Sequence, residues 1–532
     1  MTGQYILKEL SRYELGTFAD VIYRNALLYP DLEAFVWGPD RVSFRSFNER
    51  VNRLVHGLRA KGIRKGDVVG VLSWNRLEYQ EAFGAAMKGG YILAHFSPRL
   101  NTEELVGVIN DSEARVVLLE SEFAETLFEA RDRLAHVRHF VVLGKAPHGL
   151  DAYDDVVKSQ PTDEPDVQVG ENDPLTIFYT SGTTGIPRGG LYTHAQKLEN
   201  AVVKSLDIGL QFGDRHLVVL PMFHIGGDSH IWPFFLNGGC NVISPKRNFD
   251  PVEMLQTIRA EQITDVHIVP TQLVALLGLP DLEQWDLPTL KRIWYAASPM
   301  PVEVLKRGLS VFGPVFLQGY GQTESGPHTT VLRNRDHRRF MESPEDSNIL
   351  ASCGQPCLGV HMRIVDEEGQ DVQPGTIGEI LIRSKRVMSG YWRREEETSR
   401  TIKDGWLGTG DMGYYDDKGY VYIADRKKDM IITGGENVFP KEVEEILYRH
   451  PSVEEAAVIG IPDSYWIEKV HAVIALKKGA PADADDVIAF CREHLARYKA
   501  PKSVEFVDAL PKSPQGKILK KEIRTKYWKE SE

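Results

Sequence analysis

The residues with the clearest capacity for chemistry lie in the segment YTSGTTGIPRGG, from Tyr179 to Gly190. Its hydroxyl and glycine residues are Thr180, Ser181, Gly182, Thr183, Thr184 and Gly185. These hydroxyls and backbone amides, together with the guanidinium of Arg188, would form a donor-rich cradle for phosphate oxygens. The spacing differs from the common phosphate loop GxxxxGK[ST], because Pro187 stands where that pattern needs glycine. A plain surface loop rich in glycine and threonine is therefore an open alternative.

Three further segments carry side chains suited to chemistry, although each also fits an ordinary turn or tail. QGYGQTE offers the ring of Tyr320, the hydroxyl of Thr323 and the carboxylate of Glu324, an oxygen ligand that suits Mg2+. GWLGTGD places Asp411 on a tight turn, and SPQGK presents Lys517 in a basic tail. The signatures GxSxG, HExxH and a GxGxxG that opens a helix after a strand do not occur in the sequence.

The elements that must position these residues alternate between short apolar runs and helical patterns from about residue 60 to 325. This alternation predicts a largely parallel sheet covered by helices. PLTIFYT is typical of a buried strand and HAQKLENAVVKSL of a helix, so we expect the glycine-rich segment to connect a strand to a helix. The apolar face of that helix would comprise Ala195, Leu198, Ala201 and Val202. Asp250, Pro251 and Glu253 predict a helix start with a capping box.

After about residue 355 the pattern becomes an alternation of apolar and polar residues around glycine and aspartate turns, which indicates small antiparallel sheets or a barrel. The last hundred or so residues have enough helices and strands for a small α+β domain. The predicted fold class is α/β. It comprises a large N-terminal domain of packed α/β sheets with a small β-barrel-like subdomain (1–424), a hinge (425–429) and a small mobile α+β C-terminal domain (430–532). The charged hinge run also fits a solvated turn.

The composition limits the class of partner. The chain has 532 residues, 42% hydrophobic and 26% charged, with a formal net charge of -12. Such a chain has no global field for nucleic acid or an anionic membrane, so we expect small-molecule partners. No apolar run reaches the roughly 18 residues that span a bilayer, and no signal peptide is evident, which favours the cytoplasm. The four cysteines fit buried, inert thiols better than a disulfide framework or a zinc site.

Six segments in one order together resemble the core motifs of the adenylate-forming superfamily, which comprises acyl-CoA synthetases, adenylation domains and luciferases. They are YTSGTTGIPRGG, AASPM, QGYGQTE, GWLGTGD, DRKKDMIITGGEN and SPQGK, and the resemblance covers residues 20–525. It implies a ligase that uses ATP, Mg2+ and coenzyme A. A carboxylic acid attacks the α-phosphorus of ATP to give an acyl-adenylate and pyrophosphate, and a thiol then displaces AMP. It also implies rotation of the C-terminal domain between the two steps.

The resemblance implies roles for the residues that would hold the nucleotide. The segment 180–185 would bind the β- and γ-phosphates, with Thr184 among the closest donors. Thr323 would contact the α-phosphate, and Glu324 the magnesium ion. Asp411 would accept both ribose hydroxyls, with support from Arg426. Ala297, Ser298 and Tyr320 would form the adenine slot, and Gly319 and Gly321 would also belong to the cofactor-binding site.

Other implied roles concern catalysis and the thiol. Lys517 would bridge the substrate carboxylate and the α-phosphate region, and would stabilise the charge that develops during attack. Lys428 falls at the superfamily hinge. His224, in PMFHIGG, matches a gate beside the acyl pocket, and a packed core histidine is the alternative. The GGEN segment would line the tunnel for the pantetheine arm through Gly434, Gly435 and Glu436.

The sequence departs from the family pattern at three positions. Arg188 replaces the usual lysine, Gly190 stands where a branched aliphatic residue is often found, and Ile467 precedes Glu468 where many members have glycine. Because arginine keeps the charge and can grip phosphate with two N–H groups, we expect activity to survive with altered ATP affinity or release.

The leading hypothesis is an AMP-forming acid:CoA ligase acting on a fatty or other hydrophobic acid, with an aryl acid as the alternative substrate. The walls of the acid pocket are expected from residues 224–232, 296–298 and 319–326. A stand-alone adenylating enzyme that loads a carrier protein is the runner-up. A silent nucleotide-binding protein and a luciferase-like oxygenase are more remote. A homodimer is one assembly that the sequence leaves open.

Overall fold

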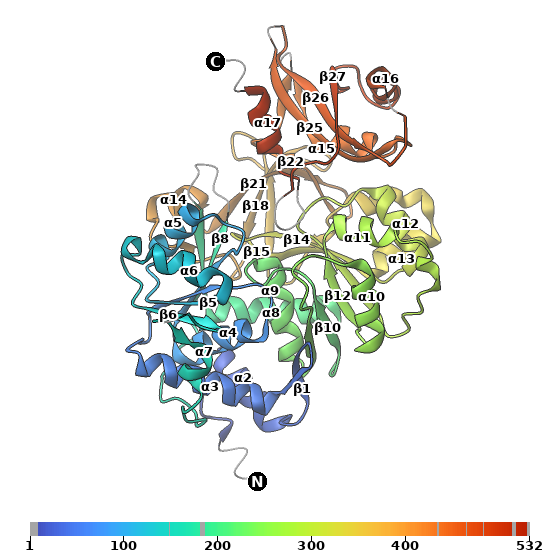
Figure 1. Ribbon diagram of the computed structural model, residues 1–532. Coiled ribbons are helices and arrows are strands. Elements are labelled where there is room, and N and C mark those ends of the chain that lie inside the picture. Colours follow the sequence, from blue (N-terminus) through green and yellow to red (C-terminus); the bar gives the residue numbers. More distant parts are fainter. Residues whose placement is uncertain are drawn as a thin grey trace.

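The computed structural model of the chain describes residues 9–147, 149–180, 187–433, 436–463, 465–481, 483–512 and 518–528. Figure 1 shows a large body of sheets and helices, with a C-terminal unit at one end and helices α2 (Phe18–Leu28) and α3 (Phe44–Ala60) at the other. Strands and helices alternate through the large body, which confirms the predicted α/β fold class.

The first large sheet contains eight strands among the described residues, in the order β19-β9-β8-β4-β3-β5-β6-β7. Their bounds are β3 (Val68–Leu72), β4 (Ile92–Phe96), β5 (Val116–Glu120), β6 (His139–Leu143), β7 (Asp151–Ala152), β8 (Pro174–Thr180), β9 (Arg188–Thr193) and β19 (Gly390–Tyr391). The strands from β8 to β7 run parallel. β3 and β4 are buried along their whole length, which is why the sequence shows uninterrupted apolar runs there.

The second large sheet contains nine strands in the described part of the chain, in the order β16-β15-β14-β13-β12-β10-β11-β1-β2. Their bounds are β1 (Glu33–Trp37), β2 (Asp40–Ser43), β10 (Arg215–Val218), β11 (Cys240–Ile243), β12 (Asp265–Ile268), β13 (Arg292–Tyr295), β14 (Phe316–Gln322), β15 (Gly326–Leu332) and β16 (Gln355–Pro356). β14 and β15 form an antiparallel hairpin with a register shift between Tyr320 and Gln322. The hairpin therefore carries the QGYGQTE motif.

Helices α8 and α9 lie between the two large sheets. Trp232 of α9 packs against Phe83 of α4, on the side of the first sheet, with ring centroids 5.4 Å apart. His230 of the same helix packs against Trp294 of β13, in the second sheet, at 5.1 Å. α4 is also buried, whereas α5 and α6 lie beside the strands of the first sheet and α10 to α12 beside those of the second (Figure 1). The bounds are α4 (Leu77–Gly89), α5 (Thr102–Ser112), α6 (Ser121–Glu129), α7 (Tyr153–Val157), α8 (His194–Ile208), α9 (Ile225–Leu236), α10 (Pro251–Ala260), α11 (Pro270–Leu277), α12 (Val302–Phe312) and α13 (Asn334–Glu342).

A smaller antiparallel sheet follows in the chain, as the alternating pattern predicts. Its strands are β17 (His361–Val365), β18 (Gly378–Arg383), β20 (Ile402–Lys403), β21 (Trp406–Tyr415) and β22 (Val421–Arg426), with α14 (Glu395–Thr401) before β20. Its inward side chains, which include Ile380, Ile382 and Leu407, form their own apolar cluster. Asp411 of β21 pairs in register with Arg426 of β22.

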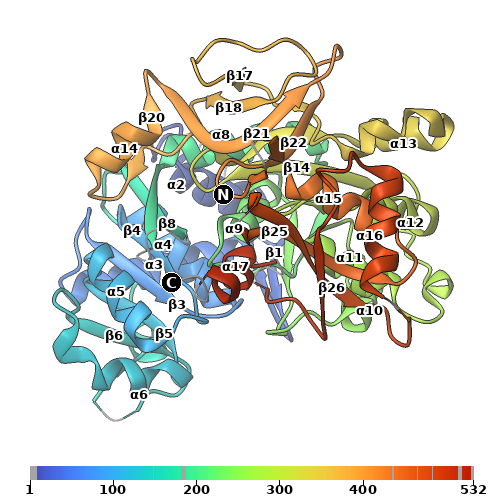
Figure 2. The same ribbon diagram turned by 90° about the horizontal axis from the view of Figure 1, so that it is seen from above.

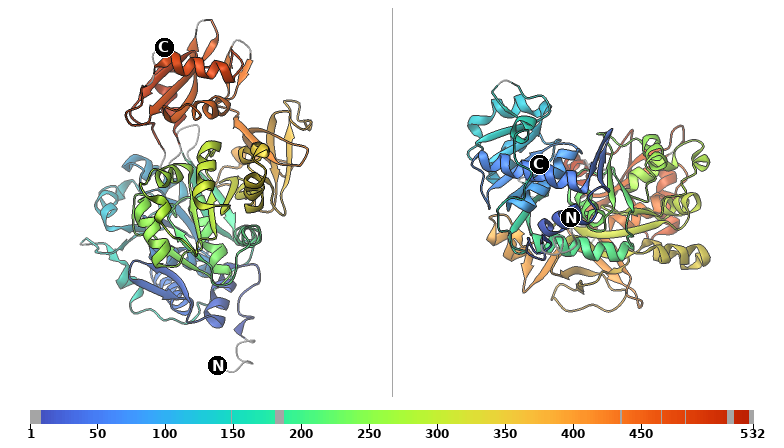
Figure 3. Two further views of the ribbon diagram at one scale, coloured as in Figure 1. Left: turned by 90° about the vertical axis from the view of Figure 1, so that its right-hand side faces the viewer. Right: turned by 90° about the horizontal axis from the view of Figure 1, so that it is seen from below.

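The C-terminal unit has a sheet and apolar clusters of its own, and the described members of these clusters all lie at or after Ile431. Its elements are β23 (Ile431–Thr433), β24 (Glu436–Val438), α15 (Pro440–Leu447), β25 (Val453–Asp463), β26 (Ile467–Leu476), α16 (Ala484–His494), β27 (Ser503–Val507) and α17 (Lys520–Trp528). Figure 2, seen from above, shows this unit over the body, and the left view of Figure 3 shows it at the end opposite the N-terminus. The division at residues 425–429 stays a prediction.

Three local expectations are wrong. The segment after β8 leads to β9, an antiparallel partner of β8, and only then to α8, so it connects two strands. Val202 is 40% exposed and does not belong to the buried face of α8. Asp250 does cap α10, with Pro251 at its start, but the Glu253 carboxylate accepts bonds from Ser244 and Thr257 and does not close a capping box. The four cysteines are free and buried, as expected.

Candidate functional site

Asp411 is the centre of a buried polar network at the end of β14. Its Oδ2 accepts hydrogen bonds from the Tyr320 hydroxyl at 2.7 Å and from Gln322 Nε2 at 2.5 Å. Its Oδ1 forms an ion pair with Arg426 Nε at 2.7 Å. Burial, followed by the nearby Asp411 carboxylate, raises the pKa of Tyr320 well above its ordinary value, so this phenol stays a donor. The structure thus brings together four residues from three separate motifs.

Glu324 belongs to a second network that reaches the start of β9. Its Oε1 accepts a hydrogen bond from the Tyr391 hydroxyl at 3.0 Å. The guanidinium of Arg188 lies 5.5 Å from the centre of the Tyr391 ring, within the range of a cation–π contact, and Arg188 Nε is 2.8 Å from Glu397 Oε2. Arg188 is therefore held by a carboxylate and an aromatic ring, and it lies beside the residue that positions Glu324.

Glycines in these motifs allow close approaches that a side chain would prevent. A Cβ on Gly190 would lie 3.3 Å from Thr323 Cγ2, and a Cβ on Gly319 would lie 2.4 Å from the Trp294 indole. A Cβ on Gly321 would lie 2.4 Å from the carbonyl oxygen of Gly326. Thr323 itself is buried, and its carbonyl accepts a hydrogen bond from the Tyr192 hydroxyl. The absence of a branched residue at position 190 thus makes room for Thr323.

The AASPM segment follows β13 and has an unusual backbone. Ala297 has φ +73°, in the left-handed region that a residue with a Cβ rarely adopts. Such strain persists where surrounding structure fixes the chain, and it is common at ligand sites. Ala297 is exposed, and Ser298 is half-buried beside it. This exposure suits the predicted adenine slot.

His224 precedes α9 and caps it, because its Nδ1 accepts a hydrogen bond from the Gly226 amide at 3.1 Å. The imidazole therefore has a local structural task at the position expected for a gate. Its role beside the acyl pocket stays a prediction.

Several predicted site residues lie outside the described residues, namely Ser181, Gly182, Thr183, Thr184, Gly185, Gly434, Gly435 and Lys517. The flanking residues are described. Thr180 is half-buried at the end of β8, and its hydroxyl donates to the Arg188 carbonyl at 3.4 Å. Glu436 is exposed in β24. Lys428 is exposed in the turn that follows β22.

The sequence analysis missed Gln322, Tyr391 and Glu397. Gln322 lies inside a recognised motif, so its amide could have been considered as a partner of Asp411. Tyr391 and Glu397 lie in no recognised motif, because they reach the site through β19, which pairs with β9, and through the start of α14. No sequence signal indicated this pairing.

The polar contacts between the two units lie close to the predicted hinge. The Asp425 carboxylate accepts a hydrogen bond from the Lys441 amide at 2.9 Å, and its Oδ2 lies 3.8 Å from Lys520 Nζ. Asp429 pairs with Arg524 at 3.3 Å. These contacts tie residues 425–429 to α15 and α17 of the C-terminal unit.

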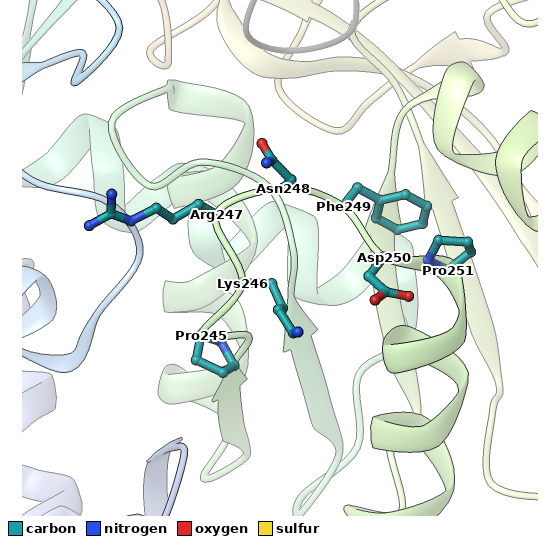
Figure 4. Close-up of a pocket in the computed structure, with 7 residues that line it drawn as sticks. All are labelled: Pro245, Lys246, Arg247, Asn248, Phe249, Asp250 and Pro251. Carbon is teal, nitrogen blue, oxygen red and sulfur yellow. The ribbon is translucent and has the colours of Figure 1, made fainter.

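A surface hollow between β11 and α10 is lined by residues 245–251 and is separate from the motifs described above (Figure 4). Arg247 extends away from the helix that begins at Pro251, toward Glu122 at 2.6 Å and Glu120 at 3.2 Å. Because two carboxylates already neutralise this guanidinium, the hollow is not a strong anion site. Among the helices of the described residues, none is both long enough and apolar enough to cross a membrane.

The fold and the connected nucleotide-type motifs are those of a two-unit adenylate-forming enzyme. Residues 22–392 match the family described as AMP-binding enzyme, and residues 442–517 match the AMP-binding enzyme C-terminal domain. The chain belongs to this family, within the adenylate-forming superfamily.

Similar proteins cover nearly the whole chain. A feruloyl-CoA synthase of Amycolatopsis sp is 37% identical over 95% of this chain and 98% of its own length. A fatty acid–[acyl-carrier-protein] ligase of Streptomyces coeruleorubidus is 33% identical over 99% of each. The crystal structure of the anthranilate CoA ligase AuaEII in complex with anthranoyl-AMP superposes with a TM-score of 0.89 and 30% identity, and covers 97% of this chain and 98% of that one.

Proposed function

We propose that the chain is an AMP-forming acid:CoA ligase. In the first step a carboxylate oxygen bonds to the α-phosphorus of ATP, and the bond from that phosphorus to pyrophosphate breaks. In the second step the sulfur of coenzyme A bonds to the acyl carbon, and AMP leaves. The observation that carries the proposal is the pair of networks around Asp411 and Glu324, which adjoin one another in the QGYGQTE hairpin.

The residues of this hairpin have the chemistry that the first step needs. Asp411 would hold the ribose hydroxyls, since its Oδ1 retains an acceptor site beside Arg426. Tyr320 and the strained Ala297 segment would hold adenine. Thr180 and Arg188 would flank the pyrophosphate, and Lys517 would stabilise the charge that develops as the carboxylate attacks.

Glu324 fits a magnesium ligand, because it is a half-buried carboxylate of which one oxygen accepts from Tyr391. Mg2+ prefers oxygen ligands and usually binds through one or two carboxylates with phosphate oxygens and water. A bound ion would neutralise phosphate charge. Tyr391 would keep the Glu324 carboxylate oriented toward it.

A second candidate function differs from the first in the thiol that accepts the acyl group. The similarity to a ligase named for an acyl carrier protein favours an enzyme that loads such a carrier. Incubation with acid, ATP and CoA decides between the two. We expect AMP, pyrophosphate and an acyl-CoA thioester, whereas AMP and pyrophosphate without thioester would refute the CoA assignment.

The similar proteins are named for acids of different classes, because their names refer to feruloyl, fatty and anthranoyl groups. We propose a hydrophobic acid, fatty or aryl, and a screen of pyrophosphate release over both classes tests this. Cytoplasmic location and a homodimer stay predictions, which cell fractionation and light scattering can test.

A further inference from the structure

Lys204 of α8 is a buried lysine with an unusual environment. It is 1% exposed, and its ammonium donates to Ser229 Oγ at 3.0 Å and to His230 Nδ1 at 2.8 Å. It also lies 5.1 Å from the centre of the Trp294 ring. No carboxylate of the described residues lies within ion-pair distance of it.

The other two lysines that are buried in the described chain are paired. Lys88 bonds to Asn48 and Asn52 and forms an ion pair with Glu164. Lys197, two turns before Lys204 on α8, pairs with Asp228, whose other oxygen accepts from Trp232. Burying a charge without a counter-charge is costly, so Lys204 calls for an explanation.

Four histidines surround this lysine, and we name them the imidazole cluster: His216, His230, His267 and His328. His230 contacts His267 at 4.1 Å between ring centres and His216 at 5.7 Å, and His328 contacts Trp294 at 5.2 Å. Each is at most 4% exposed. Five ring nitrogens of the cluster have no hydrogen-bond partner among the described residues: His216 Nε2, His230 Nε2, His267 Nδ1, His267 Nε2 and His328 Nδ1.

The bonds that do exist fix which nitrogens can donate. His328 Nε2 donates to Asp207 at 2.9 Å, because a carboxylate only accepts, and Asp207 is held in turn by Arg333. When Lys204 is protonated, His230 Nδ1 accepts from its ammonium, which leaves His230 Nε2 as a donor. A neutral His267 has one N–H, and the Gly226 backbone lies near enough to accept it. Lys204 and His230 therefore supply the unused donors of this group of contacting side chains.

Burial lowers the pKa of Lys204 and of the whole imidazole cluster, for His216 to about 3 and for His328 to about 4. The rings are therefore neutral near pH 7. An anionic oxygen beside Lys204 would restore the ammonium charge that burial disfavours.

The cluster borders the residues expected to wall the acid pocket. Ser229 and His230 lie in the segment 224–232. Trp294 lies two residues before Ala296, and its indole occupies the space that a side chain on Gly319 would fill. The Trp294 ring thus lies between Gly319 on one side and Lys204 and His230 on the other. His328 of the cluster lies on β15, which pairs with the strand that carries QGYGQTE.

We propose that Lys204 and the imidazole cluster bind a hydrogen-bond-accepting oxygen at the far end of the acid, remote from the carboxylate that is activated. This inference rests on the proposed ligase function. It selects acids that carry a second carboxylate or a phenolic oxygen over purely apolar acids. A site built from buried donors discriminates strongly against a ligand that leaves those donors unpaired.

Matched acids test the proposal on the unaltered enzyme. Heptanoate is compared with heptanedioate, and cinnamate with 4-hydroxycinnamate and 4-carboxycinnamate, by kcat/KM for pyrophosphate release. We expect at least one oxygen-bearing acid to exceed its parent by about tenfold or more. A preference for heptanedioate would indicate a second carboxylate as the ligand, and a preference for 4-hydroxycinnamate would indicate a phenolic oxygen. Equal or better activity with both apolar parents would overturn the inference while leaving the ligase function intact.

The variant Lys204→Met tests whether a preference for oxygen-bearing acids depends on this lysine. Lys204→Gln is a second variant that keeps a polar group. We expect the ratio of kcat/KM between paired acids to fall toward one in both variants. Lys306→Met, at a half-buried lysine of α12 that pairs with Glu303, is the control and should keep the ratio of the unaltered enzyme. A ratio that Lys204→Met leaves unchanged would refute the role of this lysine.

Calorimetric titration with the same acids, without ATP, measures acid binding separately from adenylation. The site would be supported if the oxygen-bearing acids bind more tightly than their parents and Lys204→Met abolishes this difference. This holds even if no acid is adenylated. The proposed function alone would then fail. Equal binding of both members of each pair would overturn the site.

Discussion

At the residue scale, Arg188 shows how a single departure from a motif changes its surroundings. The guanidinium is held by Glu397 and stacks on Tyr391, whose hydroxyl holds Glu324. Lysine would keep the charge but lose the planar fork and the stacking surface. The motif predicted a phosphate ligand at this position. It did not predict Tyr391 or Glu397, because they reach the site only through strand pairing.

We therefore expect Arg188→Lys to raise the KM for ATP about threefold to tenfold, in line with the loss of about 1 kcal/mol from a cation–π contact. Steady-state kinetics with varied ATP measures this. Arg393→Lys, at an exposed arginine paired with Glu113, is the matched control and should leave the KM unchanged. If Arg188→Lys altered neither the KM for ATP nor the turnover, the arginine in place of the usual lysine would have no functional effect.

Ile467 is a second residue at which the departure from the family pattern has a structural cost. Its φ is +71° and its side chain is 71% exposed, so its backbone is strained and its side chain buries little surface. The left-handed conformation costs a β-branched residue roughly 1–2 kcal/mol, and glycine avoids this cost. The larger conformational freedom of glycine in the unfolded chain offsets part of the gain in stability. We expect Ile467→Gly to raise the free energy of unfolding of the C-terminal unit by about 0.5–1 kcal/mol.

Denaturant unfolding, followed by tryptophan fluorescence, measures this change. Ile432→Gly is the control, because Ile432 is also exposed, at 46%, but lies in β23 with an ordinary backbone. The control should be destabilised. Destabilisation of Ile467→Gly to the same extent would show that strain at Ile467 is negligible.

At the element scale, helices and parallel strands could be predicted far better than edge strands. β3 and β4 are short, largely apolar runs because both faces are covered. β9 begins with Arg188, Gly189 and Gly190 and owes its strand structure to pairing with β8 and β19. α8 reverses the usual pattern: it buries Lys197 and Lys204 and exposes Val202 and Leu206. Periodicity in apolar residues alone therefore placed Val202 wrongly, whereas Ala201 and Leu198 do face the core.

The start of α10 gives a prediction at this scale, since the cap was predicted and the capping box was not formed. Asp250 Oδ1 accepts hydrogen bonds from the amides of Val252 at 3.0 Å and Glu253 at 3.1 Å. We expect Asp250→Ala to lower stability by about 1 kcal/mol, because two amides at the helix start lose their acceptor. Thermal unfolding measures this. Glu253→Gln should have a smaller effect, and a larger effect would mean that the Glu253 contacts with Ser244 and Thr257 matter more than the cap.

At the scale of the whole molecule, the two units have separate apolar clusters and meet through polar contacts of Asp425 and Asp429. The sequence predicts the division at residues 425–429 because charge accumulates where few apolar contacts cross between domains, and this division stays a prediction. It could not give the partners Lys441, Lys520 and Arg524, which the fold of the C-terminal unit brings to the junction. Because these contacts are polar, a rotated C-terminal unit could replace them with other polar contacts, so this geometry suits rotation.

Lys428, exposed in the turn at this junction, is the place to restrict that rotation. Proline fixes φ near −65°, and among the described backbone bonds the turn is closed by the amides of Asp429 and Met430, not by that of Lys428. We expect Lys428→Pro to fold normally and to slow thioester formation from supplied acyl-AMP more than it slows adenylation. Lys517→Ala should show the reverse bias, because the role proposed for that lysine is confined to the carboxylate in the first step. Pyrophosphate exchange and acyl-AMP conversion, measured separately for both variants, test this, and an equal loss in both half-reactions for either variant would contradict rotation between them.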